Sequence, residues 1–190
     1  MKRRRTVDKG SELFRNYVSG DESAVRELIL LYKDSLIFFV NRYVRDLSCA
    51  EELAEDSFVE LILHKDRFNF KYSVKTYLYT IGRNKALNYL KHLARRKTQS
   101  LDECEYGVSD GEELEERVIK NERQRTVNAC LERINPDYRT VLYLVYFENL
   151  QTEECMRVMK KSKKQIENLL YRGKEALKKE LGKEGISDEI

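Results

Sequence analysis

The stretch RFNFKYSVKTYLYTIGRNKALNYLKHLARRKTQSL, residues 67–101, is rich in basic and aromatic residues and contains no aspartate or glutamate. The chain is acidic on both sides of it: residues 46–60 carry six carboxylates, and residues 102–116 contain no lysine or arginine. A basic segment with interleaved aromatic rings is typical of surfaces that bind phosphates and stack exposed bases. The same pattern also fits a solvated basic helix face whose aromatic rings belong to the core.

The composition predicts an all-α chain. A length of 190 residues allows one domain or two small ones, and 41% hydrophobic residues are enough for modest cores. One proline, no tryptophan and eight glycines favour helices. The net charge of +3 is small, so the distribution of charge, rather than its total, points towards nucleic acid.

Several classes of protein are disfavoured. The two histidines lie at no metal-ligand spacing and the four cysteines form no C-x-x-C pair, so we expect reduced thiols in a cytoplasmic protein, with no metal and no cofactor. No apolar run approaches the roughly 18 residues of a membrane helix, and the basic residues 2–5 precede no hydrophobic signal region. Neither a phosphate-binding glycine loop nor a constellation of catalytic side chains is present, so we do not expect an enzyme. The cysteines are Cys49, Cys104, Cys130 and Cys155.

Three helices are predicted in the first half. The first begins near Asp21 and carries an apolar stripe at helical spacing. The second opens with a capping box of Ser48 and Glu51, and its carboxylates lie mainly opposite its apolar face. Acidic residues in a first turn also suit the helix dipole, so a solvated helix explains part of this cluster. Residues 65–73 read as a loop, and the third helix runs from Ser73 to about Arg96. The stripe of the first helix comprises Val25, Leu28, Ile29, Tyr32, Leu36, Phe39, Val40 and Tyr43.

Helical periodicity is lost between residues 98 and 113, where glycine, serine and acidic residues gather. This composition indicates an interdomain linker. We therefore expect helical domains at residues 10–97 and 114–182, followed by a tail at 183–190.

The second domain is predicted to contain a helix-turn-helix. Asn135 and Pro136 form an N-cap followed by proline at the first helical position. Thr152 then caps a short helix that ends near Met159, and about three residues later a capping box opens a longer helix. Two closely joined helices with a basic second N-terminus suit DNA, although plain helical hairpins are also common. The capping box is Ser162 with Gln165, and the basic residues are Lys160, Lys161, Lys163 and Lys164.

Three of these segments together resemble the bacterial RNA polymerase sigma factors of the small extracytoplasmic-function (ECF) group within the sigma-70 family. Residues 46–58 resemble the acidic helix that docks on the clamp coiled coil of the largest polymerase subunit. Residues 73–90 resemble the helix that reads and opens the minus-ten-type promoter element. Residues 135–172 resemble the domain that reads the minus-thirty-five-type element. The resemblance covers roughly residues 12–182 in the order of the family.

The resemblance implies three sets of site residues. The polymerase-binding set is Glu51, Glu52, Leu53, Glu55, Asp56 and Phe58. The minus-ten-type set combines a base-capturing loop with the helix that follows it: Phe68, Asn69, Phe70, Lys71, Tyr72, Arg83, Asn84, Lys85, Asn88, Lys91 and Arg95. The minus-thirty-five-type set is Ser162, Lys163, Lys164, Gln165, Asn168, Tyr171, Arg172 and Lys174. Phe68 and Phe70 also fit the domain core, and that alternative stays open.

The implied partners are core RNA polymerase, through its clamp coiled coil and flap, and promoter DNA in duplex and single-stranded form. An anti-sigma factor is a further expected partner, and the implied location is the cytoplasm, at the nucleoid, without membrane insertion. The sequence departs from the family pattern at several positions, and those in the recognition helix put its DNA preference in question. The departing residues are Glu55, Asn88, Lys160, Glu167 and Leu169, and the tryptophan common in the acidic helix is absent.

Two other functions compete with this one. A DNA-binding regulator that acts without polymerase explains the helix-turn-helix but gives the acidic helix no role. A helical adaptor that binds only proteins would show no salt-dependent affinity for DNA. The role of the acidic linker is left open by the sequence.

Overall fold

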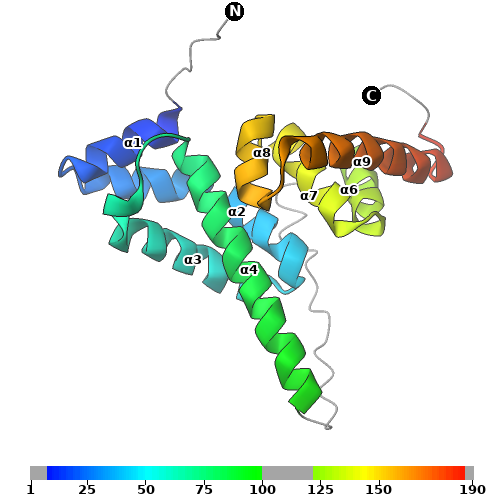
Figure 1. The fold of residues 1–190 in the computed structure, drawn as a ribbon, viewed down its shortest axis with the longest axis horizontal. Coiled ribbons are helices and arrows are strands. Elements are labelled where there is room, and N and C mark those ends of the chain that lie inside the picture. The colour runs from blue at the N-terminus through cyan, green and yellow to red at the C-terminus, as the bar shows by residue number, and fades with distance from the viewer. Residues whose placement is uncertain (1–7, 100–121, 187–190) are drawn as a thin grey trace, which may run out of the picture. The chain divides into compact units, whose positions relative to one another are not determined.

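The computed structural model describes residues 8–99 and 122–186, and every regular element in these ranges is helical (Figure 1). The helices form two compact units, which confirms the predicted all-α fold with two domains. Residues 98–113 lie outside the described ranges except for the first two, which end a helix, so the linker and the exact domain bounds stay predictions. The first unit contains α1 (Lys9–Val18), α2 (Ser23–Val44), α3 (Leu47–Leu63), the 3₁₀ turn η1 (Lys65–Arg67) and α4 (Val74–Gln99). The second contains α6 (Glu122–Arg133), α7 (Pro136–Leu142), the π-helical turn η2 (Tyr143–Phe147), α8 (Thr152–Met159) and α9 (Lys163–Lys183).

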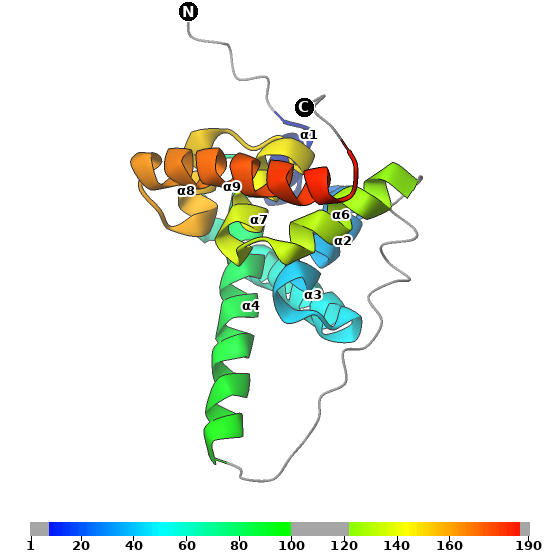
Figure 2. The same ribbon diagram turned by 90° about the vertical axis from the view of Figure 1, so that its right-hand side faces the viewer.

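Helix α2 is the centre of the first unit, where it packs against α1, α3 and α4. Five residues of its predicted apolar stripe are buried and the other three are half-buried. Gly82 of α4 faces this stripe, and a β-carbon there would lie 3.0 Å from Leu36 and 3.3 Å from Val40. Glycine therefore allows α4 to approach α2 closely. The C-terminal half of α4 extends beyond the other helices of this unit (Figures 1 and 2).

Helix α1 was not predicted from the sequence. Asp8 caps it by accepting a hydrogen bond from the Ser11 backbone N–H at 3.2 Å. The Ser11 hydroxyl in turn accepts a hydrogen bond from the backbone N–H of Val74, the first residue of α4, at 3.0 Å. Phe14 of α1 is fully buried. Helix α1 therefore caps the start of α4 and contributes to the core of the unit.

Two predicted helix starts are wrong. Asp46 caps α3, since its carboxylate accepts a hydrogen bond from the Cys49 backbone N–H at 2.9 Å, so the helix begins before the proposed Ser48 capping box. Gln151, rather than Thr152, caps α8, in a capping box with Glu154. In both cases a competing polar residue one or two positions earlier satisfies the free N–H groups of the first turn.

The second unit is built around α9, which packs against α6, α7 and α8. Ile166 of α9 is fully buried, and a β-carbon on Gly173 would lie 3.3 Å from Leu142, so α9 and α7 approach closely at this point. The predicted capping box at the start of α9 is confirmed: Ser162 N–H donates to Gln165 Oε1 at 2.8 Å, and Gln165 N–H donates to Ser162 Oγ at 3.3 Å. The predicted N-cap Asn135 is also confirmed, since its side chain accepts from the Asp137 N–H.

Candidate functional site

The acidic surface of the first unit lies on α3. The carboxylates of Glu51, Glu52, Glu55 and Asp56 are exposed, and Leu53 is half-buried. Phe58 is only 4% exposed, so its ring belongs to the core and supports the helix from within. The structure thus brings four of the six predicted polymerase-binding side chains fully to the surface of one helix.

Three exposed apolar side chains that were not predicted lie beside this surface. Leu30 of α2 is 74% exposed, and Val59 and Leu63 of α3 are 51% and 70% exposed. An ion pair of 3.9 Å between Lys33 of α2 and Glu55 of α3 shows which positions of the two antiparallel helices lie opposite each other. Leu30 lies three residues before Lys33, and Val59 lies four residues after Glu55. Because the helices are antiparallel, both side chains lie about one turn from the ion pair, towards the same end of the helix pair. Val59 and Leu63 are four residues apart in α3, so they lie on the same face of the helix. Their positions fall outside the apolar stripes, so periodicity gave no sign of them.

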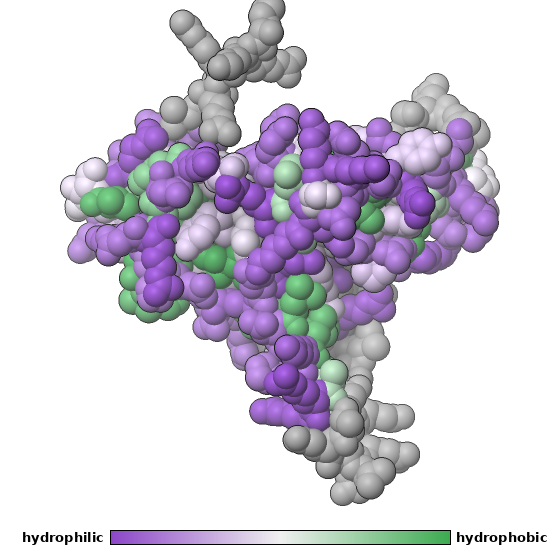
Figure 3. Space-filling view, in the orientation of Figure 1, coloured by the Kyte–Doolittle hydropathy of each residue, from purple (hydrophilic) through white to green (hydrophobic). Residues whose placement is uncertain are grey.

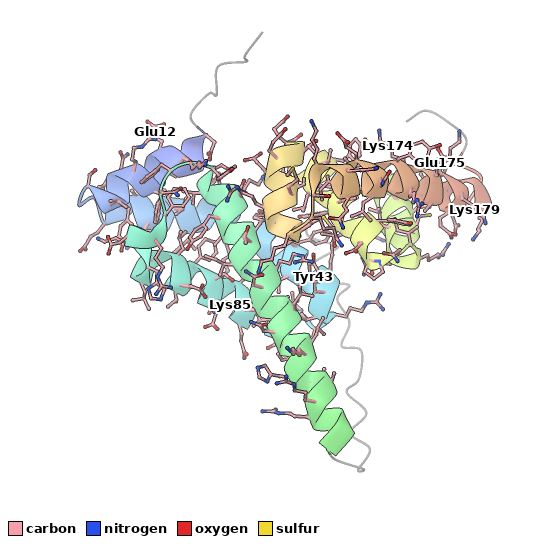
Figure 4. The ribbon with its side chains drawn as sticks, viewed as in Figure 1. Glu12, Tyr43, Lys85, Lys174, Glu175 and Lys179 are labelled. Atoms are coloured by element: carbon pink, nitrogen blue, oxygen red, sulfur yellow. The ribbon has the colours of Figure 1, made fainter. Side chains whose placement is uncertain are left out.

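Lys85 of α4 lies between the acidic surface and the basic helix. Its ammonium is 3.2 Å from a Glu60 carboxylate oxygen and 3.6 Å from a carboxylate oxygen of Asp56. The Lys85 side chain is 24% exposed, less than either carboxylate, and it is drawn on the side of α4 that faces α3 (Figure 4). A residue predicted to bind DNA and a residue predicted to bind polymerase are therefore in contact.

The loop between η1 and α4 contains an aromatic cluster. Phe68 is 7% exposed, and its ring centroid lies 5.4 Å from that of Phe14, 4.7 Å from that of Phe70 and 5.4 Å from that of Tyr77. Phe68 is therefore a core residue in this structure, which is the alternative that the sequence left open. It is a support of the loop rather than an exposed ring for a base.

Phe70 lies at the rim of the cluster and is half-buried. Its φ of 54° is in the left-handed region, which costs a residue with a side chain on the order of 1 kcal/mol. The Arg15 guanidinium carbon of α1 lies 5.0 Å from the centroid of its ring, in a cation–π contact. Asn69 and Lys71 are exposed on either side, and the Asn69 side-chain oxygen accepts from the Lys71 N–H at 3.1 Å. Tyr72 is half-buried.

Helix α4 presents the remaining predicted minus-ten-type residues. Arg83, Asn84 and Lys85 are half-buried, whereas the side chains nearer the C-terminus of the helix are exposed. Positions 84, 88, 91 and 95 recur at intervals of three and four residues, so they share one face of the helix. The predicted DNA-binding residues that are exposed on α4 are Asn88, Lys91 and Arg95.

The predicted residues of the second unit are all exposed along α9. The Lys163 ammonium lies 3.9 Å from a Glu167 carboxylate oxygen, one turn further along. The turn before α9 is sharp because Lys160 adopts a left-handed φ of 53°. Lys174, drawn with Glu175 and Lys179 in Figure 4, has its ammonium 5.5 Å from the centroid of the Tyr146 ring. Tyr146 and its neighbour Phe147 are about half exposed and were not predicted to be functional.

The surface in Figure 3 is mainly hydrophilic, which suits binding to charged partners.

Burial raises the pKa of the Cys155 thiol to about 12, and it also raises the pKa values of Cys49 and Cys130. These three cysteines are free thiols in the structure, and Cys104 lies outside the described residues. No helix in the described part of the chain combines the length and apolarity that crossing a bilayer requires.

Comparison with known proteins places these surfaces in one family. Residues 28–96 match Sigma-70 region 2 and residues 124–177 match Sigma-70 region 4, which together cover more than half of the chain. The chain is 27% identical to the RNA polymerase sigma-H factor of Pseudomonas aeruginosa, over 93% of this chain and 95% of that protein. It is 26% identical to the ECF RNA polymerase sigma factor SigW of Bacillus subtilis, over 85% and 91% of the two chains. Among solved structures, the fold is similar to the sigma factor RpoE of Bartonella quintana in complex with the anti-sigma factor NepR, with a TM-score of 0.64, 17% identity, and coverage of 83% and 96%.

Proposed function

The chain belongs to the ECF group of the sigma-70 family, whose members bind core RNA polymerase and direct it to promoters. From this premise we propose which of its surfaces binds polymerase and which bind promoter DNA. Helix α3 docks on polymerase, the loop before α4 captures an unpaired base, and α4 and α9 contact promoter DNA. One observation carries the proposal: an exposed acidic helix, a basic aromatic loop and a basic helix-turn-helix occur in the order of regions 2 and 4.

We propose that polymerase docking uses both the carboxylates of α3 and the apolar side chains beside them. The carboxylates attract a basic partner surface and repel DNA phosphates, so they keep DNA away from this face. Leu30, Val59 and Leu63 supply apolar area that the partner can cover, and burying such area is favourable at about 25 cal/mol per Å². Polymerase and DNA then occupy different faces of the same unit.

Promoter opening is assigned to the loop of residues 69–72. Unstacking a base costs a few kcal/mol, and stacking it on an aromatic ring returns roughly 1–3 kcal/mol. Phe70 and Tyr72 are half-buried and offer ring surface, while Asn69 and Lys71 offer an amide and a cation. Phe68 holds the loop in place from within the core. The exposed cations and amides of α4 continue this surface along the DNA backbone and base edges.

The minus-thirty-five-type element is assigned to the N-terminal half of α9. The free N–H groups at a helix N-terminus favour phosphate, and Lys163 and Lys164 lie there with exposed ammonium groups. Gln165, Asn168 and Arg172 follow at intervals of three and four residues, so they share a face that can enter the major groove. This arrangement supports recruitment to duplex DNA, separately from strand opening in the first unit.

We also propose that an anti-sigma factor binds this protein, because the RpoE structure that it resembles was solved with the anti-sigma factor NepR. Such a partner would compete with polymerase for the docking surface on α3. We place the protein in the cytoplasm, at the nucleoid, where core polymerase and promoters are found, and we assign it no catalytic step of its own.

Run-off transcription with core RNA polymerase and a library of genomic fragments tests the proposal. We expect transcripts from a defined subset of fragments only when both core polymerase and this protein are present. The rival DNA-binding regulator would instead bind specific duplex by itself and leave the set of start sites of core polymerase unchanged. Specific binding of the isolated protein without any new start site would overturn the proposal.

A further inference from the structure

Lys85 belongs to two surfaces at once. It lies on α4, among the residues proposed to contact promoter DNA, but its ammonium is 3.2 Å from Glu60 and 3.6 Å from Asp56 on α3. Asp56 in turn belongs to the surface proposed to bind polymerase. Lys85 is the least exposed of the three side chains, so its ammonium is directed towards the carboxylates rather than into solvent.

In this arrangement Lys85 does not favour DNA. The ammonium and the two carboxylates together carry a net charge of −1, so the group repels a phosphate instead of attracting it. The ion pairs are partly exposed, and exposed pairs of this kind are weak. A competing positive charge can therefore exchange with Lys85 at small cost.

We propose that docking of core polymerase on α3 releases Lys85 to contact promoter DNA. A basic polymerase surface that binds Asp56 takes over one of the two carboxylates that hold the ammonium, so that only Glu60 remains, and its positive charge neutralises the local negative charge and repels Lys85. The long flexible side chain of lysine then turns to a phosphate, where it acts as a point charge. The inference rests on the proposed function, and it adds a physical reason why promoter contacts by the first unit depend on polymerase.

A purely structural role for the same contacts makes a different prediction. If Lys85 only fastens α4 to α3, removal of the carboxylates leaves its ammonium in place and gives no specific gain in DNA affinity. If Lys85 is held away from DNA, removal of the carboxylates provides one additional phosphate contact. One phosphate contact steepens the log–log dependence of affinity on salt by about 0.7 to 0.9 unit.

The experiment uses the full-length protein without polymerase and a fluorescent duplex of mixed sequence with a single-stranded overhang. Affinity is measured by anisotropy over a series of salt concentrations for the wild type and for Asp56→Asn/Glu60→Gln. The matched control is Glu51→Gln/Glu52→Gln, which removes the same number of charges from the same helix, away from Lys85. A fourth protein adds Lys85→Gln to the Asp56 and Glu60 substitutions. Thermal unfolding of each protein verifies that it is folded.

We expect the Asp56→Asn/Glu60→Gln protein to bind more tightly than the matched control, with a salt slope steeper by about one phosphate contact. Lys85→Gln should abolish this excess. Equal affinity in the two double variants, or an excess that persists with Lys85→Gln, would overturn the exchange. The wild type is tested in run-off transcription in parallel. Normal transcripts without the excess in DNA affinity would refute the Lys85 inference alone. The absence of transcripts would refute the proposed function.

Discussion

Replacing Phe68 and Phe70 separately should distinguish a core ring from a base-capturing ring. Phe68 is 7% exposed and contacts three other rings, and removing such a side chain from a core costs about 3–5 kcal/mol. In a domain of this size 1 kcal/mol corresponds to about 4–8 °C in Tm, so Phe68→Ala should lower Tm by at least about 12 °C. We expect promoter opening to fail together with folding of the first unit.

Phe70→Gly should have the opposite balance. The half-buried ring contributes on the order of 1 kcal/mol by burial, and glycine adds an entropic cost of roughly 0.5–1 kcal/mol. Loss of the cation–π contact with Arg15 adds roughly 0.5–1 kcal/mol, whereas relief of the left-handed backbone returns on the order of 1 kcal/mol, so the net loss should be about 1–2 kcal/mol, well below that of Phe68→Ala. Promoter opening should nevertheless fail, because the unpaired base loses a stacking surface worth roughly 1–3 kcal/mol.

Thermal unfolding and permanganate footprinting of unpaired thymines measure the two effects on the same proteins. Recruitment of polymerase to duplex promoter should survive in Phe70→Gly, because no cation is removed. Equal losses of Tm in the two variants would refute the division into core and rim. Normal thymine reactivity with Phe70→Gly would refute the role of this ring in opening.

Three further predictions concern the other surfaces. Lysine at the four exposed carboxylates of α3 (Glu51, Glu52, Glu55 and Asp56) should abolish co-purification with core polymerase and leave the circular dichroism spectrum unchanged. The control variant, with lysine at Glu12 and Glu22, should still bind polymerase. Retained binding in the first variant would argue against docking through α3. Alanine at Lys163, Lys164 and Arg172 should weaken recruitment of polymerase to the promoter. The log–log dependence of recruitment on salt should fall by roughly one unit for each phosphate that is no longer bound, and opening of an already recruited promoter should be unchanged. An unaltered salt dependence would show that these residues do not contact DNA. Lys160→Gly should raise the stability of the second unit by roughly 0.5 kcal/mol in thermal unfolding, because relief of its left-handed φ of 53° outweighs the entropic cost of glycine. A lower Tm would show that this backbone is not strained.

Local patterns in the sequence predicted local structure well. The apolar stripe of α2 and the capping box of Ser162 and Gln165 depend only on neighbours within a few residues, and the structure contains both. The start of α3 was mispredicted because Asp46 and Ser48 are both good caps, and the path of the chain into the helix decides between them. Helix α1 was missed because it is short and contains glycine and serine, which are weak helix formers.

The functional side chains show the limit of such patterns more clearly. Phe68 and Phe70 are two residues apart in a loop, where periodicity carries no signal. Their burial depends on packing against Phe14, more than fifty residues earlier, whose ring lies closer to Phe68 than to Phe70. The contact of Lys85 with Asp56 and Glu60 likewise depends on how α3 and α4 pack. The sequence indicated the chemistry of these side chains, but the packing of distant segments decides which of them are available to a partner.

The cap that α1 places on α4 determines how the promoter-opening half can be prepared as an isolated fragment. The match to Sigma-70 region 2 begins at residue 28, which makes that position an obvious place to start an expressed fragment. A fragment cut there would lack Ser11, whose hydroxyl accepts the buried Val74 N–H, so the start of α4 would lose a hydrogen bond with a net value of about 0.5–1.5 kcal/mol. It would also lack Phe14 and Arg15, so Phe68 would lose one wall of its pocket and Phe70 its cation. If such a fragment failed to bind DNA, the failure could be caused by the missing α1 rather than by the loop itself. A fragment that begins at or before Asp8 retains the loop in its native surroundings.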